Sequence, residues 1–260
     1  SSLPDLPVDP ARQPAQTVRL EGRAGPLTAA QSKAILERLA LRSGGQATSI
    51  FDRHLAVEEA ITDSPLTVGN EVQLLQDGPA TYASMFAAIE AARDHINMET
   101  YILDDDEVGQ KFVGLLIDKQ QQGVQVNLIR DSVGTLQTPP ELFKRMADSG
   151  IQLLEFNPVN PLLAKKGWEL NQRDHRKLLI TDGSTVFLGG INISSVYSGG
   201  SFSKASSKRP DGALAWRDTD LKLQGPVVAE FQKLFLATWA KQKGPELAAR
   251  DYFPALVPKG

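Results

Sequence analysis

The most constraining feature of the sequence is a regular alternation of strand-like and helix-like segments between residues 69 and 156. The predicted strands are 72–75, 96–103, 124–129 and 151–156, and the predicted helices between them are 81–94, 108–121 and 141–148. Within 96–103, apolar and polar residues alternate with the period of two that a strand requires. A chain with this rhythm folds as a sheet covered by helices. The sequence therefore predicts an α/β domain in which helices flank a mixed sheet.

The segments outside this alternation set the expected domain organisation. Residues 1–26 contain many prolines and little periodicity, and we expect an extended arm there. Thr28 is a candidate N-cap for a helix that ends at Arg42, and a second helix is expected over 51–62. We assign residues 1–67 to an N-terminal extension, 68–245 to the main domain, and 246–260 to a tail or a linker to a second half.

Composition excludes several kinds of site. The 28 basic residues nearly balance the 31 acidic ones, which weighs against nucleic acid as a partner. Without cysteine there are no disulfides and no thiolate ligands or nucleophiles. His54 and His95 are expected to be surface or packing residues, and Asp104–Asp106 an acidic helix start. We therefore expect neither a metal nor another cofactor.

A short motif carries the chemistry. Residues His175 to Asp182 read H-x-K-x-x-x-x-D, and G-G-x-N follows at 189–192. On a strand, His175 and Lys177 would share one face, whereas Arg176 would face away and tolerate alanine better. Asp182-Gly183 predicts a tight turn between strands 176–181 and 185–188, which would return Asn192 to the neighbourhood of His175.

These residue types suit the cleavage of a phosphodiester, whose negative charge repels nucleophiles. Lys177 and Asn192 can donate hydrogen bonds to the phosphate oxygens. A neutral His175 can attack phosphorus if a carboxylate fixes its tautomer. Asp218 is the candidate for this carboxylate, and Asp220, on the same strand face, is the alternative.

From about Val68 to Trp239 the chain resembles the phospholipase D superfamily, and within it the N-terminal half of a bacterial cardiolipin synthase. The segments that carry the resemblance are Asn97–Tyr101, Gly123–Val126, His175–Asp182, Gly189–Asn192 and Trp216–Asp218 with Gly225-Pro226 after it. The resemblance implies a phospholipase D-like sandwich and a site in which two H-x-K-x-x-x-x-D motifs face each other. One histidine attacks and the other protonates the leaving alcohol.

For this chain, the resemblance implies a phosphatidyltransferase that forms a phosphohistidine at His175 and makes cardiolipin from phospholipid. His175, Lys177 and Asp182 are the implied catalytic set, although Asp182 is expected to act more as a structural brace than as a reactant. A phospholipase D-type nuclease or phosphodiesterase remains an alternative, as does a non-catalytic scaffold or lipid-binding partner. Glu99 and Tyr101 could either reach the active-site rim or simply pack beside a helix.

The chain departs from the two-motif pattern because it contains one motif. His54 is followed by Ala56, and His95 by Asn97, at the position where the motif has lysine. We therefore expect a partner, either a C-terminal half with its own H-x-K-x-x-x-x-D or a second copy in a homodimer. Lys165, Lys166 and Trp168 could contact a membrane surface, and the expected location is peripheral to the membrane or in the bacterial cell envelope.

Overall fold

The computed structural model describes residues 69–158, 173–198 and 218–259. It also describes Thr67 and, closer to the N-terminus, residues 21–22, 25–26, 28, 30–31, 33–34, 37 and 41. Contacts divide the chain into two units, Ser1–Thr67 and Val68–Gly260.

The first unit contains a pair of very short strands, β1 (Glu21–Gly22) and β2 (Gly25–Pro26), which are antiparallel. The sequence pattern predicts an extended arm over residues 1–26. It could not indicate this strand pair, because two residues are too few to show the alternation of a strand. The described residues 30, 31, 33, 34, 37 and 41 are helical. Thr28 Oγ1 accepts a hydrogen bond from Gln31 N at 3.3 Å, and Gln31 Oε1 accepts one from Thr28 N at 2.9 Å. These reciprocal bonds confirm the predicted helix start. The predicted helix over 51–62 lies outside the described residues.

The second unit is built on a seven-stranded sheet with the order β3-β9-β8-β7-β4-β5-β6. Its strands are β3 (Glu71–Gln76), β4 (His95–Thr100), β5 (Gln125–Asp131), β6 (Gln152–Phe156), β7 (Leu178–Thr181), β8 (Thr185–Gly189) and β9 (Thr219–Gln224). Strands β4, β5 and β6 are parallel, and the remaining pairs are antiparallel. The predicted mixed sheet is confirmed.

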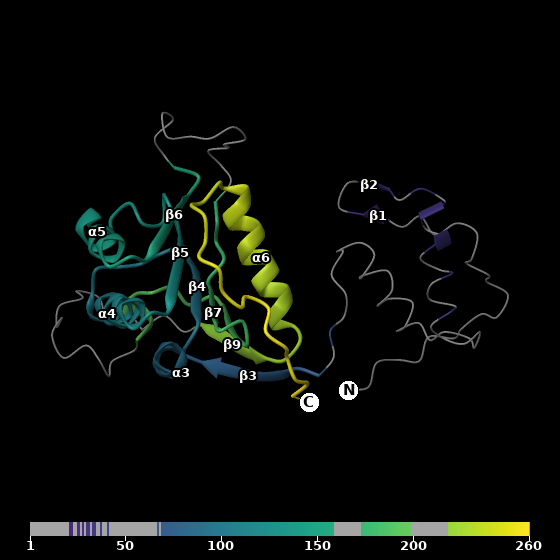
Figure 1. Ribbon diagram of the computed structural model, residues 1–260, viewed down its shortest axis with the longest axis horizontal. Helices are drawn as coiled ribbons and strands as arrows, with labels where there is room; N and C mark the ends of the chain where they lie inside the picture. The colour runs from purple at the N-terminus through teal and green to yellow at the C-terminus, as the bar shows by residue number, and fades with distance from the viewer. Residues whose placement is uncertain are drawn as a thin grey trace, which may run out of the picture. The chain divides into compact units, whose positions relative to one another are not determined.

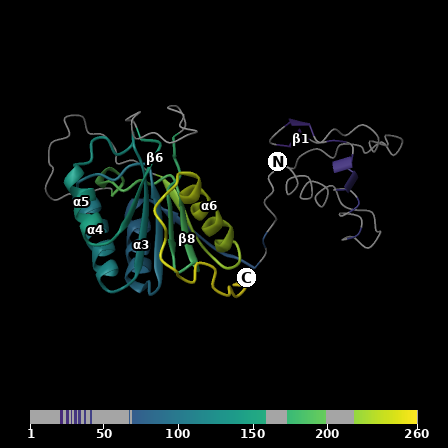
Figure 2. The same cartoon turned by 45° about the horizontal axis from the view of Figure 1, so that its top comes forward.

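Helices cover both faces of this sheet (Figures 1 and 2). Helices α3 (Gly78–Ala91), α4 (Glu107–Gln121) and α5 (Pro140–Asp148) lie on one face, and α6 (Val228–Lys241) lies on the other. Helix α3 begins three residues before its predicted start, because Asp77 caps it by accepting a hydrogen bond from Ala80 N at 3.0 Å. None of the described helices combines the length and the hydropathy that a membrane crossing requires.

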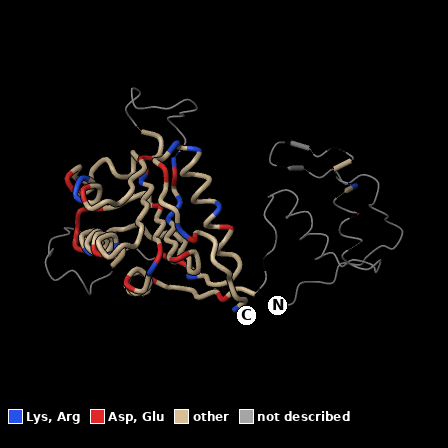
Figure 3. The backbone as a smooth tube through the Cα atoms, in the orientation of Figure 1, with Lys and Arg blue, Asp and Glu red and all other residues tan. Residues whose placement is uncertain are grey.

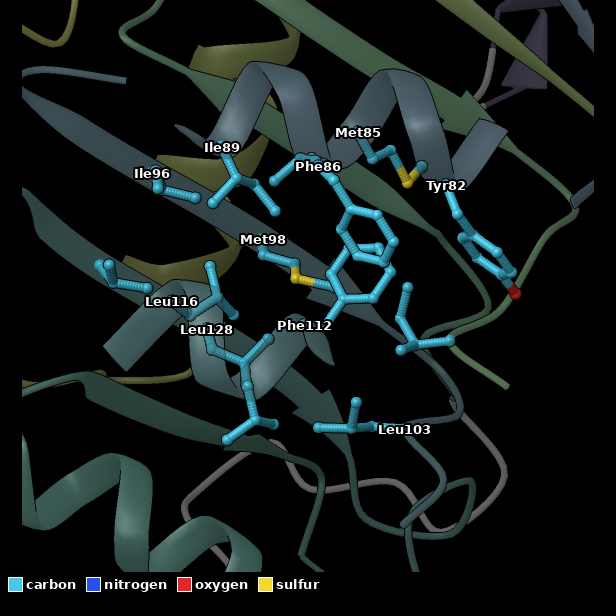
Figure 4. Close-up of a cluster of buried hydrophobic side chains, with 14 of the residues drawn as sticks. Tyr82, Met85, Phe86, Ile89, Ile96, Met98, Leu103, Phe112, Leu116 and Leu128 are labelled. Carbon is cyan, nitrogen blue, oxygen red and sulfur yellow. The ribbon is translucent and has the colours of Figure 1, made fainter. Parts of the chain in front are cut away.

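Aromatic packing fixes α3 and α4 to the sheet (Figure 4). The ring centroid of Phe112 lies 4.7 Å from that of Phe86 and 5.8 Å from that of Tyr82. Met98 of β4 belongs to the same buried cluster. Each large side chain buried in this way contributes about 2 kcal/mol, and the cluster therefore holds β4 firmly. This strand leads directly into the candidate site.

A second apolar cluster joins the opposite face of the sheet to α6. It contains Ile180, Phe235 and Trp239, with Leu247 and Leu256 of the C-terminal segment packed against it. The indole Nε1 of Trp239 donates to Pro245 O at 2.8 Å. Residues 245–259 therefore pack along the α6 side of the sheet, and Lys259 N donates to Gly69 O at 2.8 Å.

Candidate functional site

The histidine and lysine of the motif lie in an extended segment, residues 173–177, that leads into β7. The predicted strand 176–181 therefore begins two residues late. The pairing of β7 with β4 stops at Leu178, which lies opposite Glu99, and residues 176 and 177 therefore have no partner on that strand. The alternation of side chains continues through the segment nevertheless. Arg176 reaches Thr238 of α6 at 3.0 Å, whereas His175 and Lys177 lie against Tyr101 on the other side.

Tyr101 organises the two motif residues. Its ring stacks on the imidazole of His175 with a centroid separation of 3.9 Å and an interplanar angle of 25°. Lys177 Nζ lies 5.5 Å from the centroid of the same ring and donates a hydrogen bond to His175 O at 2.6 Å. Within the described residues, neither imidazole nitrogen makes a hydrogen bond. The arrangement therefore presents an imidazole and an ammonium group together at the end of β4.

Electrostatics around Lys177 combine burial with acidic neighbours. Burial lowers the pKa of Lys177, and the charges of Asp174, Asp218 and Asp220 partly offset that effect. In the described part of the second unit, acidic and basic residues are interspersed along the backbone (Figure 3). Attraction for a phosphate at this site is therefore local.

Asp218 and Asp220 explain the two glycines of G-G-x-N. A Cβ at Gly189 would overlap Oδ1 of Asp220, and one at Gly190 would overlap the carboxylate of Asp218. Burial, followed by the charge of Asp218, raises the pKa of Asp220 to about 6, although Ile191 N donates to its Oδ1 at 3.1 Å. Asp218 accepts from Thr219 N at 2.8 Å. No hydrogen bond joins Asp218 to His175 among the described residues, and its role in orienting the histidine stays a prediction.

Asn192 does return to the same rim, but its amide group is largely engaged within the fold. Its Oδ1 accepts from Ile102 N at 3.2 Å, and its Nδ2 donates to the Tyr197 hydroxyl at 3.0 Å. Since Ile102 follows Tyr101, these bonds connect the 190–197 segment to the group around His175. One amide hydrogen is left for a phosphate oxygen, and that role also stays a prediction.

Asp182, the last residue of the motif, lies at the far end of β7 from His175. Seven steps along a nearly extended chain, at about 3.3 Å each, separate the two by roughly 20 Å. The carboxylate accepts hydrogen bonds from the backbone N–H groups of Arg93, Asp94 and His95, the shortest at 2.8 Å. These contacts make it a latch between β7 and the start of β4, and its place in the catalytic set stays a prediction. The structural interpretation favoured by the sequence describes it better.

Two further residues of the site, Asp174 and Arg176, were missed by the sequence analysis. Arg176 Nη2 lies 2.8 Å from Glu99 Oε1, and its Nε lies 3.0 Å from Asp174 Oδ1. Arg176 faces away from Lys177 as predicted, but its guanidinium contacts two buried carboxyl groups, and its expected tolerance of alanine is revised. The sequence contained a partial signal, since Glu99 is an ionisable residue within the predicted strand 96–103.

The remaining candidates have structural surroundings. Asp106 caps α4 by accepting from Val108 N and Gly109 N, both at 3.0 Å, as predicted. In the part of the chain that the structure describes, no group of three or more acidic or histidine side chains is placed to hold a metal. His95 is fully buried, with Asp94 Oδ2 and Gln232 Nε2 each 2.8 Å from its ring nitrogens. It is a packing residue. His54, Lys165, Lys166 and Trp168 lie outside the described residues.

Comparison with known proteins supports the resemblance to the phospholipase D superfamily that the motif suggested. Residues 85–200 match the family model described as "Cardiolipin synthase, PLD-like domain". The chain is 34% identical over 205 residues to a cardiolipin synthase from Geobacillus sp. strain WCH70, and 35% identical over 196 residues to cardiolipin synthase A from Pseudomonas entomophila strain L48. The alignments cover 78% and 73% of this chain. The chain spans 38% of the length of each of these relatives.

Among solved structures, the chain is similar to Nuc from Salmonella typhimurium, a phospholipase D family member. The TM-score is 0.47 with 18% identity, and the match covers 69% of this chain and 99% of that one. The motif, the mixed sheet and the cardiolipin synthase similarities lead to one assignment. The chain is a member of the phospholipase D superfamily and resembles the bacterial cardiolipin synthases within it.

Proposed function

We propose that this chain supplies one half of a phospholipase D-type active site that transfers a phosphatidyl group to make cardiolipin. The observation that carries the proposal is the placement of His175 and Lys177 together against Tyr101 at the end of β4. The similarity to cardiolipin synthases supports phospholipid as the substrate class. A nucleophile beside a fixed cation is the minimum that displacement at a phosphodiester requires.

The reaction would proceed in two displacements at phosphorus. In the first, a nitrogen of neutral His175 forms a P–N bond while the P–O bond to the departing alcohol breaks. A second, protonated imidazole gives its proton to that alcohol. In the second displacement, the acceptor alcohol forms a new P–O bond, the P–N bond breaks, and the second imidazole takes up the proton of the acceptor.

Lys177 would stabilise the charge on the non-bridging phosphate oxygens, assisted by the free amide hydrogen of Asn192. Asp218 would fix the tautomer of His175 once substrate is bound. Because apo geometry at catalytic groups is often looser than in the complex, the missing bond to Asp218 does not argue against this role.

The second imidazole must come from elsewhere. His95 is buried and held by Asp94 and Gln232, and it therefore cannot reach a substrate. His54 lacks the lysine of the motif. We therefore propose that a second H-x-K-x-x-x-x-D, from a C-terminal half or from another copy of this chain, completes the site at a membrane surface.

The test combines the protein with phosphatidylglycerol vesicles, alone and together with a separately produced segment that carries a second motif. Mass spectrometry would follow cardiolipin, released glycerol and a phosphatidyl adduct on His175. We expect product only from a paired site, and none from His175→Ala or Lys177→Ala. Lys144→Ala, which removes an exposed lysine paired with Asp148, is the matched control and should remain active.

Three outcomes would contradict parts of this proposal. Full turnover by a strictly monomeric chain, as judged by light scattering, would refute the half-site. Cleavage of plasmid DNA without any reaction on lipid would move the function to a nuclease. An active His175→Ala variant would refute the covalent mechanism.

A further inference from the structure

Three ionisable side chains meet beneath the segment that carries His175. Glu99 comes from β4, and Asp174 and Arg176 come from the extended segment itself. The guanidinium of Arg176 contacts Glu99 Oε1 at 2.8 Å and makes two bonds to the carboxylate of Asp174, at 3.0 and 3.1 Å. Glu99 and Asp174 are 1% and 4% exposed, and the cluster is therefore shielded from water on its acidic side.

The cluster holds the residues on both sides of His175. Asp174 precedes the histidine and Arg176 follows it. Arg176 contacts Glu99 directly, and its guanidinium connects Asp174 to Glu99. Glu99 is also two residues before Tyr101, whose ring stacks on the imidazole. One buried carboxyl group on β4 therefore ties the neighbours of His175 to the strand that supplies its stacking partner. None of the three side chains contacts the imidazole directly.

The charge balance of the cluster requires a proton. Two carboxylates facing one guanidinium in a buried place would leave an uncompensated negative charge. Burial, together with the nearby Asp174, raises the pKa of Glu99 to about 9. Burial alone would raise the pKa of Asp174 as well, but its hydrogen bonds with Glu99 and Arg176 lower it. A pKa of about 9 would keep Glu99 neutral near pH 7, beside an ionised Asp174 and a cationic Arg176.

The charged groups that act on Glu99 in the described residues are Asp174 and Arg176. Helix α6 contributes the uncharged hydroxyl of Thr238, which accepts from Arg176 Nη2 at 3.0 Å. Asp131, at the end of β5, accepts from Asp174 N at 3.0 Å and supports the cluster through the backbone.

We propose that Glu99 is a positioning residue for His175, which acts by holding Arg176 and Asp174 so that the imidazole stays stacked on Tyr101. The inference rests on the proposed function only where it concerns turnover. The geometric part concerns the fold of this chain alone. It can therefore be tested without a complete active site.

The primary test is proton NMR of the His175 ring. Stacking on Tyr101 shifts the ring protons of His175 upfield, and His175→Ala identifies them among the signals of the three histidines. We expect Glu99→Ala to remove this upfield shift. Glu99→Gln, which replaces a neutral carboxyl group with a neutral amide, should keep it at pH 7. Raising the pH through about 9 should remove the shift in the parent protein but not in Glu99→Gln.

Glu230→Gln is the matched control, because it changes a carboxyl group to an amide in an exposed ion pair of α6. It should behave as the parent at every pH. An unchanged His175 shift in Glu99→Ala, or identical pH responses of Glu99→Gln and the parent, would overturn the proposal. If Glu99→Ala does not fold, the pH comparison with Glu99→Gln still decides.

Turnover gives a second readout when the second motif is present. Displacement of a reacting group by about 1 Å can reduce kcat about a hundredfold, and we expect Glu99→Ala to lower kcat at least tenfold with little change in KM. If the NMR response occurs as expected but the parent protein acts on no phospholipid, the proposed function fails while the positioning role stands. A normal kcat in Glu99→Ala would show that the stacking is not needed for the reaction.

Discussion

The latch at Asp182 gives a prediction whose magnitude follows from its contacts. Its carboxylate accepts hydrogen bonds from three consecutive backbone N–H groups, those of residues 93 to 95, at distances from 2.8 to 3.1 Å. These groups lie where α3 ends and β4 begins. Replacing Asp182 with alanine removes all of these bonds at once and loosens the connection between β7 and β4.

The expected cost can be worked out bond by bond. A hydrogen bond to a charged group contributes about 1.5–3 kcal/mol, but Arg93 is exposed, and water can replace the bond to its N–H. The other two N–H groups therefore dominate, and we expect a loss of about 3 kcal/mol. Asp182 also has φ of 50°, a left-handed conformation in which alanine costs about 1 kcal/mol more. Asp182→Gly removes the latch without this strain and separates the two contributions.

Urea unfolding at pH 7 would measure these losses. We expect Asp182→Ala to lower the free energy of unfolding by about 4 kcal/mol and Asp182→Gly by about 3 kcal/mol. At a temperature where the variants stay folded, Asp182→Gly should retain most of its turnover. A loss of stability below about 1 kcal/mol would refute the latch. A folded Asp182→Gly variant without turnover would make Asp182 a reactant after all.

Three further predictions concern the rim of the site. Tyr101→Phe keeps the aromatic stack and should retain kcat, whereas Tyr101→Leu should lower kcat about tenfold or more in initial-rate assays. Arg176→Ala should lower the free energy of unfolding by about 2 kcal/mol, because it leaves two buried carboxyl groups without their half-exposed cation. Lys177→Ala should abolish turnover with little effect on the free energy of unfolding. Burial raises the pKa of Asp220 to about 6 from 3.8, and its stabilising contribution is therefore complete below pH 3.8 and is lost as the pH rises through 6. Relative to Asp220→Asn, the parent should lose up to about 1.4 kcal/mol per pH unit across that window, and parallel stability curves for the two proteins would contradict this.

Much of the fold could be predicted because the second unit follows local rules. Each predicted strand and helix between residues 72 and 156 is present, with bounds that differ by at most three residues. The differences arise at the ends, where a cap such as Asp77 or the loss of a pairing partner decides the boundary. The order of the strands could not be read in the same way. It places β9, late in the chain, between β3 and β8, and this depends on pairing between distant segments.

The site divides along the same line between local and long-range information. The H-x-K spacing is local, and it correctly places His175 and Lys177 on one side and Arg176 on the other. The partners of these residues come from β4 and the residue after it, about 75 residues earlier, and no spacing rule connects Tyr101 to His175 or Glu99 to Arg176. One local signal did exist, because a carboxyl group in a fully buried strand is costly unless a partner compensates it. A buried carboxyl group on a strand therefore predicts that a partner exists, and the sheet pairing of Glu99 with Leu178 identifies the segment that supplies it.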